Sequence, residues 1–272
     1  MDHSMGRIFS KKQKKKGQRM DGKETETVVT TVNGGVTLRE YKDGIRFGTD
    51  ALLLSGFALP KLRKGLCADF GTGSGVLPLL LLSAGCKSDF LAVELQKSYA
   101  LLAERNMEEN GFSDRVRVCW GDLREKNAFL PAGSVSAVIC NPPYLRAGAG
   151  KQNLAEEKRL AWHDDCLTAD QLAEAACRAL CEGGKLFCLY LPERMATLIA
   201  ALKAHRLEPK RLRLVAPSAE EKPCLLLLEA MKDASEGLIA EPMFCIYRDR
   251  SHREESEQMT EIYRLFGDRR GT

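Results

Sequence analysis

The 272-residue sequence contains no apolar run near the roughly 20 residues that a membrane-spanning helix needs. Its first residues also lack the apolar core of a secretory signal, so we expect a cytoplasmic protein without a membrane partner. No internal repeat is visible, which argues against a solenoid architecture. Apolar residues make up 44% of the chain and charged residues 29%, an ordinary balance for a globular protein.

The sequence also lacks closely spaced cysteines and histidines of the kind that bind metal ions. The chain has 10 cysteines but no Cys-x-x-Cys pair, and its 4 histidines are scattered. Several cysteines fall within apolar, strand-like runs, where a reduced thiol acts as a small apolar side chain. We therefore expect reduced, buried cysteines and no metal site.

Positive charge is concentrated at the N-terminus. Residues 1–20 carry seven basic side chains against one acid, so a total net charge of +4 leaves residues 21–272 at −2. We expect disorder over this lysine-rich, aperiodic tail, which can neutralise nucleic-acid phosphates. It could equally be a leader that only aids solubility. The candidate phosphate contacts are Lys11, Lys12, Lys14, Lys15 and Lys16.

Beyond the tail, two β-type runs flank Asn33-Gly34-Gly35 and predict a β-hairpin. From residue 65 onward, short apolar runs alternate with helical patterns, which predicts an α/β fold with a doubly wound, mainly parallel sheet. The last two runs have no full helix between them, so we expect an antiparallel last strand. The expected strands are 65–70, 89–94, 115–120, 136–141, 184–191, 212–217 and 224–230, and the expected helices are 75–85, 96–111, 168–184 and 194–207.

The glycine-rich loop DFGTGSG (69–75) directly follows the first of these strands. Glycines let the backbone turn sharply and let a ligand approach the main chain. Acids end the next two strands: Glu94 could bind ribose hydroxyls, and Asp122 could meet an adenine amino group. Alternatively, these acids only cap strand ends and helices. The loop resembles the first motif of class I methyltransferases, which implies S-adenosylmethionine as the cofactor, with contacts at Asp69, Gly71, Thr72, Gly73 and Gly75.

A second motif, Asn141-Pro142-Pro143-Tyr144, ends an apolar strand. Because two prolines cannot donate to a sheet ladder, the chain must leave the sheet at Asn141, at the same edge as the glycine loop. The side-chain oxygen of Asn141 and the main-chain oxygen of Pro142 can accept hydrogen bonds from the two N–H groups of a planar amino group. Tyr144 can stack on the ring that carries this amino group. These three residues are the candidate catalytic residues, and Asn141 is also a candidate cofactor contact. The alternative is an Asn-Pro turn that only ends a strand.

Together these motifs resemble the bacterial tRNA(Val) adenine-37 N6-methyltransferases. The segment RFGTDALLL (46–54) is similar to the family's FxxGTDxxLL signature, which implies that Phe47, Thr49 and Asp50 bind or gate the cofactor. Alternatively, Thr49 or Asp50 is an ordinary helix N-cap. Similarity to the Gram-positive branch extends to LAWHD (160–164), GGK (183–185), PER (192–194), EPKR (208–211) and EPMFCIY (241–247).

The resemblance implies a Rossmann-like, seven-stranded class I methyltransferase that acts on adenine 37 in the anticodon loop of a valine tRNA. Bases in such a loop are unpaired, so presenting one to a pocket costs less than flipping it from a duplex. The chain departs from the pattern at Trp162-His163-Asp164, where we expect an Arg-His-Glu run, so base contacts there are in doubt. The candidate RNA contacts beyond the tail are Arg146, Lys151, Lys158 and His163.

We expect a monomer or weak dimer built of a disordered tail (1–24), a hairpin and cofactor-covering helix (25–60), a methyltransferase domain (61–250) and a helical C-terminal tail (251–272). Three other functions stay open. A glutamine-N5 methyltransferase of the release-factor type would use the same Asn-Pro-Pro-Tyr motif, but those enzymes usually carry a helical domain before the glycine loop. The others are a ribosomal RNA or DNA N6-adenine methyltransferase and a non-catalytic RNA-binding module.

Overall fold

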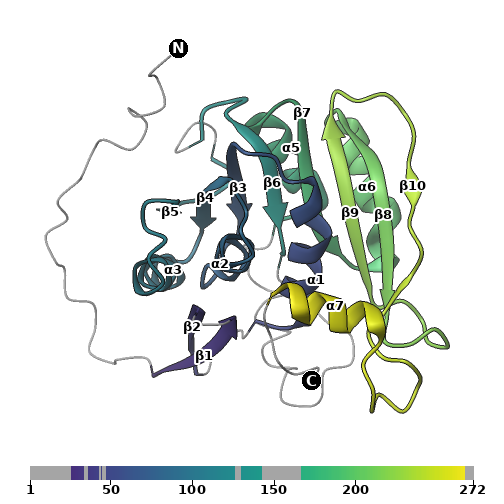
Figure 1. The fold of residues 1–272 in the computed structure, drawn as a ribbon. Coiled ribbons are helices and arrows are strands. Elements are labelled where there is room, and N and C mark those ends of the chain that lie inside the picture. Colours follow the sequence, from purple (N-terminus) through teal and green to yellow (C-terminus); the bar gives the residue numbers. More distant parts are fainter. Residues whose placement is uncertain are drawn as a thin grey trace, which may run out of the picture.

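The computed structural model describes residues 26–33, 36–42, 44, 47–125, 130–142 and 167–266. Its centre is a nine-stranded sheet in the order β10-β8-β9-β7-β6-β3-β4-β5, with β11 also paired to β8. Helices cover both faces of this sheet (Figure 1). The arrangement confirms the predicted Rossmann-like, mainly parallel α/β fold, although the sheet has nine strands where seven were expected, because two short strands, β10 and β11, also pair with β8.

The strands from β3 to β7 all run parallel to their neighbours in this group, whereas β9 runs antiparallel to both β7 and β8. Only a short turn joins β8 to β9, and a turn of that kind can connect antiparallel strands but not parallel ones. The expected antiparallel last strand is therefore confirmed. The strands are β3 (Leu66–Phe70), β4 (Asp89–Glu94), β5 (Val116–Trp120), β6 (Val135–Cys140), β7 (Leu180–Tyr190), β8 (Leu207–Ala216), β9 (Leu225–Lys232), β10 (Ile239–Ala240) and β11 (Phe244–Cys245).

Each face of the sheet has its own apolar core. Along β4, Phe90 and Ala92 pack on one side, while Leu91 and Val93 pack on the other. A strand covered on both faces needs a continuous apolar run, which is the pattern seen in the sequence. The first face is covered by α1 (Thr49–Ala58), α2 (Val76–Ser83), α3 (Lys97–Glu109) and α7 (Glu257–Leu265), and the second by α5 (Ala169–Ala179) and α6 (Met195–Ala204).

The short elements complete the described chain. The predicted N-terminal hairpin is confirmed as β1 (Thr27–Asn33) and β2 (Val36–Tyr41), and it lies beside α2 and α3 near the carboxyl ends of the parallel strands (Figure 1). Single 3-10 turns, η2 (Leu59–Lys61) and η3 (Pro192–Arg194), follow α1 and precede α6. No helix in this part of the chain is long and apolar enough to cross a bilayer. The boundaries of the four expected segments stay predictions.

The predicted C-terminal end of one helix was wrong. The helix predicted over 168–184 stops at Ala179, and β7 begins at once with Leu180. Leu180 pairs with Val135, but the next pair along β6 joins Ala137 to Lys185, so the residues between them form a bulge. Gly183 has a φ of +67° in this bulge. The Glu-Gly-Gly sequence that resembles a helix end therefore marks a distortion within a strand.

Candidate active site

The two motifs meet where neighbouring strands end. Phe70 of β3 pairs with Cys140 of β6, so Gly71 and Asn141 leave the sheet side by side. On the other side of β3, β4 ends with Glu94. Ligands bind at the carboxyl edge of such sheets, next to loops of this kind. The half-buried Asn141 and Pro142 therefore lie beside the glycine loop, as the sequence predicted.

The glycine loop has a backbone that only glycine adopts readily. Gly71, Gly73 and Gly75 have φ values of +72°, +56° and +84°. A Cβ built on Gly71 or Gly73 would have no atom within 4 Å, whereas one on Gly75 would lie 3.0 Å from Met107 Cε. Gly71 and Gly73 thus leave open space for a ligand over the loop, while Gly75 is needed for close packing against α3.

Asp69 lies beneath this loop and is fully buried. Its Oδ2 accepts a hydrogen bond from Thr72 Oγ1 at 2.6 Å, while its Oδ1 has no partner among the residues described. Burial raises the pKa of the Asp69 carboxyl to about 7, and the nearby charge of Glu94 acts in the same direction. The open space over the loop and the unsatisfied buried oxygen both fit a cofactor that carries hydrogen-bond donors.

Glu94 closes the side of the loop. Its Oε2 accepts from Gly73 N at 2.9 Å and its Oε1 from Gln96 N at 2.8 Å. Each carboxylate oxygen can accept a second hydrogen bond, so the side chain keeps the capacity to bind ligand hydroxyls. Its buried position next to Gly73 matches the predicted place of a ribose-binding acid.

Asp122 lies farther along the same edge, after β5. Both of its carboxylate oxygens bind Arg124, at 2.9 Å and 2.6 Å from guanidinium nitrogens. Hydrogen bonds from Arg124 hold the pKa of Asp122 below its usual value, so this acid is ionised at neutral pH. An adenine amino group would share Asp122 with Arg124, a partner that the sequence did not suggest.

The start of α1 shows that one alternative, a helix capped by Thr49 or Asp50, was wrong. The N-cap of α1 is Gly48, so neither Thr49 nor Asp50 caps the helix; both lie in its first turn. Phe47 packs against the core and donates its backbone N–H to Glu40 Oε1 at 2.6 Å. The cofactor contacts of these three residues stay predictions.

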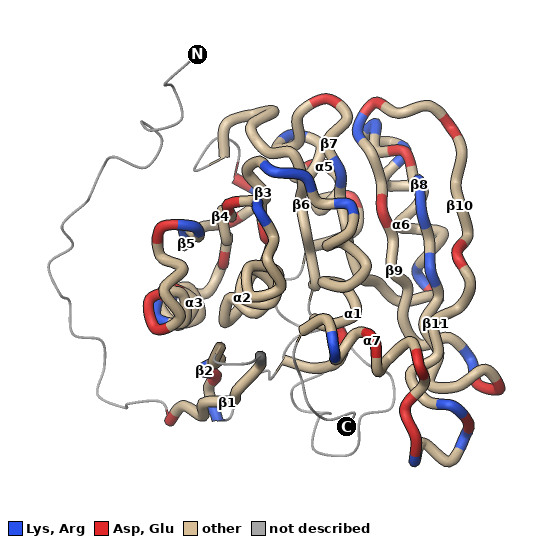
Figure 2. The backbone as a smooth tube through the Cα atoms, in the orientation of Figure 1, with Lys and Arg blue, Asp and Glu red and all other residues tan. Residues whose placement is uncertain are grey.

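The other candidate residues lie outside the described part of the chain, so their placement stays a prediction. They are Tyr144, Arg146, Lys151, Lys158, His163 and the five tail lysines, Lys11, Lys12, Lys14, Lys15 and Lys16. In the described part, basic and acidic positions are interspersed along the backbone (Figure 2). No group of three or more potential metal ligands occurs there.

Sequence reasoning missed three polar residues near this site. Asn106 and Glu40 are buried, and Asn110 faces the hairpin from one turn farther along α3. An available signal was the spacing of the two asparagines, four residues apart on one face of an amphipathic helix. Exposed Trp120 at the end of β5 was also missed; its indole N–H donates to Leu95 O at 2.9 Å.

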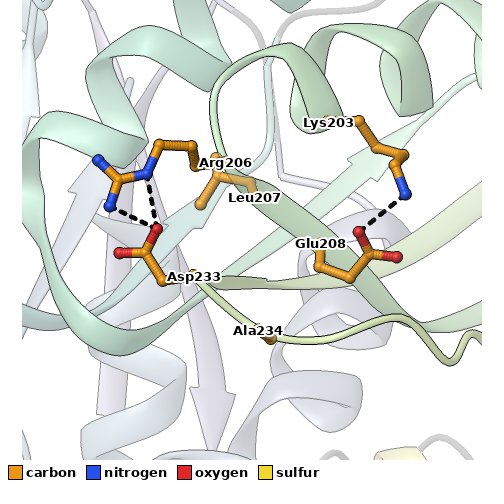
Figure 3. Close-up of a pocket in the computed structure, with 6 residues that line it drawn as sticks. All are labelled: Lys203, Arg206, Leu207, Glu208, Asp233 and Ala234. Atoms are coloured by element: carbon orange, nitrogen blue, oxygen red, sulfur yellow. Dashed lines mark hydrogen bonds and ion pairs between the residues drawn. The ribbon is translucent and has the colours of Figure 1, made fainter.

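A hollow of about 290 Å³ lies elsewhere, where β8 begins and β9 ends. Arg206 points toward Asp233 and Lys203 toward Glu208 in this hollow (Figure 3). The four charged side chains lining it are paired with one another, and it opens at the sheet edge opposite the glycine loop. It is therefore separate from the candidate active site.

Comparisons with known proteins identify the family of the chain. Residues 42–195 match the methyltransferase small domain family. The chain is 32% identical over 209 residues to a tRNA1(Val) (adenine(37)-N6)-methyltransferase of Photobacterium profundum, covering 75% of this chain and 85% of the relative. It is 27% identical to a protein of the same name from Escherichia fergusonii, covering 85% of this chain and 95% of the relative. A crystal structure of a predicted O-methyltransferase from Agrobacterium tumefaciens has the same fold, with a TM-score of 0.64, 21% identity and coverage of 80% of this chain and 97% of that one.

Proposed function

This chain belongs to the methyltransferase small domain family, and we propose that it methylates N6 of an adenine in tRNA, with adenine 37 of a valine tRNA as the target. The family implies S-adenosylmethionine as the methyl donor. The observation that carries the proposal is the pairing of Phe70 with Cys140, which sets Asn141 beside Gly71. A residue that can hold a target amine thus lies next to a loop that fits the donor.

The chemistry follows from two oxygens at the end of β6. When bound, S-adenosylmethionine supplies an electrophilic methyl group on a positively charged sulfur. The nitrogen of an adenine amino group is a poor nucleophile, because its lone pair is delocalised into the ring. Asn141 Oδ1 and the carbonyl oxygen of Pro142 would accept hydrogen bonds from its two N–H groups, orient its lone pair and stabilise the positive charge that develops on nitrogen. As the new N–C bond forms, the bond from the methyl carbon to sulfur breaks, and the nitrogen then loses one proton.

The choice of tRNA rests on the relatives. Two proteins that align with 75% and 85% of this chain are both named for adenine 37 of tRNA1(Val). The names of these relatives favour RNA over protein as the substrate.

The decisive experiment offers both substrates to one enzyme. Purified protein is incubated with labelled S-adenosylmethionine and either tRNA lacking the modification or a release factor. We expect label in tRNA, and N6-methyladenosine at position 37 of a valine tRNA after nuclease digestion. Label only in the release factor would overturn the RNA assignment, and label in neither would favour a non-catalytic RNA-binding protein.

A further inference from the structure

Helix α3 holds the N-terminal hairpin with two asparagine side chains. Asn110 Oδ1 accepts from Thr37 N at 2.9 Å, and its Nδ2 donates to Thr37 O at 2.7 Å. One turn earlier, Asn106 binds Arg39 N at 2.8 Å and Arg39 O at 2.9 Å in the same way. The two amides thus pair with the outer edge of β2 as a neighbouring strand would.

This fit follows from the geometry of the two elements. Four residues of an α-helix rise about 6 Å along its axis. Two residues of a β-strand rise about 6.6 Å, and the backbone groups of alternate residues point to the same edge. Asn106 of α3 and its C-cap residue Asn110 are four residues apart, and they therefore meet alternate residues of β2, Arg39 and Thr37 in that order. Two similar amide pairs can thus form.

Only one of the two asparagines also reaches the glycine loop. Asn106 Nδ2 donates to Ser74 O at 2.8 Å, whereas Asn110 Nδ2 donates within α3 to Asn106 O at 2.7 Å. Asn106 is fully buried, and its neighbour Met107 packs against Gly75. The side chain of Asn106 thus forms hydrogen bonds with both the hairpin and the glycine loop.

The far end of β2 holds the other candidate cofactor segment. Glu40, which is buried, accepts the backbone N–H of Phe47 at 2.6 Å. Between them, Gly44 lies so close to α3 that an added Cβ would be 2.6 Å from the Tyr99 hydroxyl. The hydroxyl of Tyr41 also donates to Ser98 O at 3.0 Å. Tyr41 and Gly44 thus lie against the N-terminal end of α3, and Glu40 links β2 to the backbone of Phe47.

We propose that the N-terminal hairpin is a positioning element of the cofactor site. Asn106 couples the docking of β2 to the glycine loop, and Glu40 couples it to Phe47. Neither side chain needs to touch the cofactor. The inference rests on the proposed function, because it assumes that the loop binds S-adenosylmethionine.

The test compares Asn106→Ala with Asn110→Ala. Each substitution removes one amide pair to β2 and one further hydrogen bond, so we expect similar losses of thermal stability. Only Asn106→Ala releases Ser74, so by calorimetry it should bind S-adenosylmethionine about tenfold more weakly, while Asn110→Ala stays close to the wild-type affinity. Equal affinities in the two variants would overturn the role of Asn106.

A second pair of variants tests the role of Glu40. Glu40→Gln keeps an oxygen that can accept the Phe47 N–H, whereas Glu40→Ala does not. We expect weaker cofactor binding in Glu40→Ala and recovery of much of the loss in Glu40→Gln. Equal affinities in both variants would overturn the link to Phe47.

A measurement on the unaltered protein covers the case in which Asn106→Ala does not fold. Coupling between two sites is reciprocal, so the cofactor should slow hydrogen exchange at the Arg39 amide more than at the Thr37 amide. Unchanged exchange at both amides would overturn the proposal. If the wild-type protein bound no S-adenosylmethionine at all, the proposed function would fail first, which is a distinguishable result.

Discussion

At the scale of the residue, Asn141 is the side chain that the proposed transfer needs most. It follows the last paired residue of β6 and lies next to Gly71, where a target amine would meet the donor. Losing one preorganised acceptor of developing charge typically slows a reaction by about 10²- to 10³-fold. We expect Asn141→Ala to lose turnover on that scale in single-turnover assays, with cofactor affinity retained by calorimetry.

A control separates chemistry from folding. Asn110→Ala removes a comparable amide from the surface between α3 and the hairpin and should keep most of the turnover. Wild-type turnover in Asn141→Ala would remove this residue from the mechanism. Turnover lost equally in both variants would point to general damage.

Asp69 makes stability depend on pH. Burial raises its pKa from the ordinary value of 3.8 to about 7, so the folded state holds a proton that the unfolded state has already released. Between about pH 4 and 7 the unfolded state therefore binds fewer protons than the folded state. As the pH rises through this range, this carboxyl lowers the free energy of unfolding by at most about 1.4 kcal/mol per pH unit.

Urea unfolding between pH 4 and 8 measures this effect. Asp69→Asn keeps the shape of the side chain but cannot titrate, so the variant should lose the part of the pH dependence that arises below pH 7. Thr72→Val is the matched control: it removes the hydrogen bond to Asp69 Oδ2 and leaves the buried carboxyl in place. Identical slopes in wild type and Asp69→Asn would show that Asp69 is ionised throughout.

At the scale of the element, α1 is fastened to the sheet by Arg211 of β8, whose side chain is 14% exposed. Arg211 donates to Glu229 at 2.8 Å, to Glu241 at 3.1 Å and to the carbonyl of Phe57 in α1 at 2.7 Å. Its guanidinium also lies 3.8 Å from the centre of the Phe57 ring. Without Arg211, Glu229 and Glu241 would keep Lys185 and Arg213 as partners at 2.6 Å, so the loss should stay below the about 3–5 kcal/mol of a buried charge left wholly uncompensated.

We therefore expect Arg211→Met to lower the free energy of unfolding by about 1.5–3 kcal/mol in urea titrations, the usual contribution of hydrogen bonds to charged groups. The control is Arg206→Met, because Arg206 pairs with Asp233 but its side chain is 70% exposed. Exposed pairs contribute little, so this variant should remain close to wild type. Similar losses in both variants would show that burial of the pair does not matter.

The elements predicted best were those whose pattern needs no distant partner. Continuous apolar runs such as 89–94 and 136–141 indicated strands buried on both faces, and β4 and β6 lie there. The bulge after Leu180 was missed because Glu-Gly-Gly also ends helices. The two-residue strands β10 and β11 are too short to show any period and exist only by pairing with β8.

The candidate site was likewise predicted only in part. The positions of Gly71, Glu94 and Asn141 followed from strand ends, because parallel strands bring their carboxyl ends to one edge. The spacing of Asn106 and Asn110 indicated a shared helix face, but the contacts of Asn106 and Glu40 could not be predicted, because a polar residue on a helix or hairpin faces water unless a particular backbone group meets it. Their partners, Ser74 and Phe47, are distant in sequence or follow a turn that no simple pattern describes.

At the scale of the whole molecule, charge and catalysis belong to different parts of the chain. The basic excess lies in residues 1–20, and residues 21–272 are net −2. Figure 2 shows basic and acidic positions interspersed along the described backbone. The lysine-rich tail precedes β1 directly, and the hairpin lies near the carboxyl edge of the parallel strands (Figure 1). RNA drawn in by the tail would therefore arrive close to the glycine loop.

Deleting residues 1–19 should weaken tRNA binding most at low salt. Each phosphate neutralised by a basic side chain adds about 0.7 to 0.9 to the slope of log affinity against log salt concentration, so losing several lysines should flatten that slope measurably. A full-length variant with the five tail lysines, Lys11, Lys12, Lys14, Lys15 and Lys16, changed to Gln keeps the length of the tail and should behave like the deletion. Turnover at saturating tRNA should stay near wild type in both, because Asn141 and the glycine loop are untouched. A slope identical to wild type in the deletion would show that the tail does not contact phosphates, and a flattened slope in the deletion alone would assign the effect to length rather than charge.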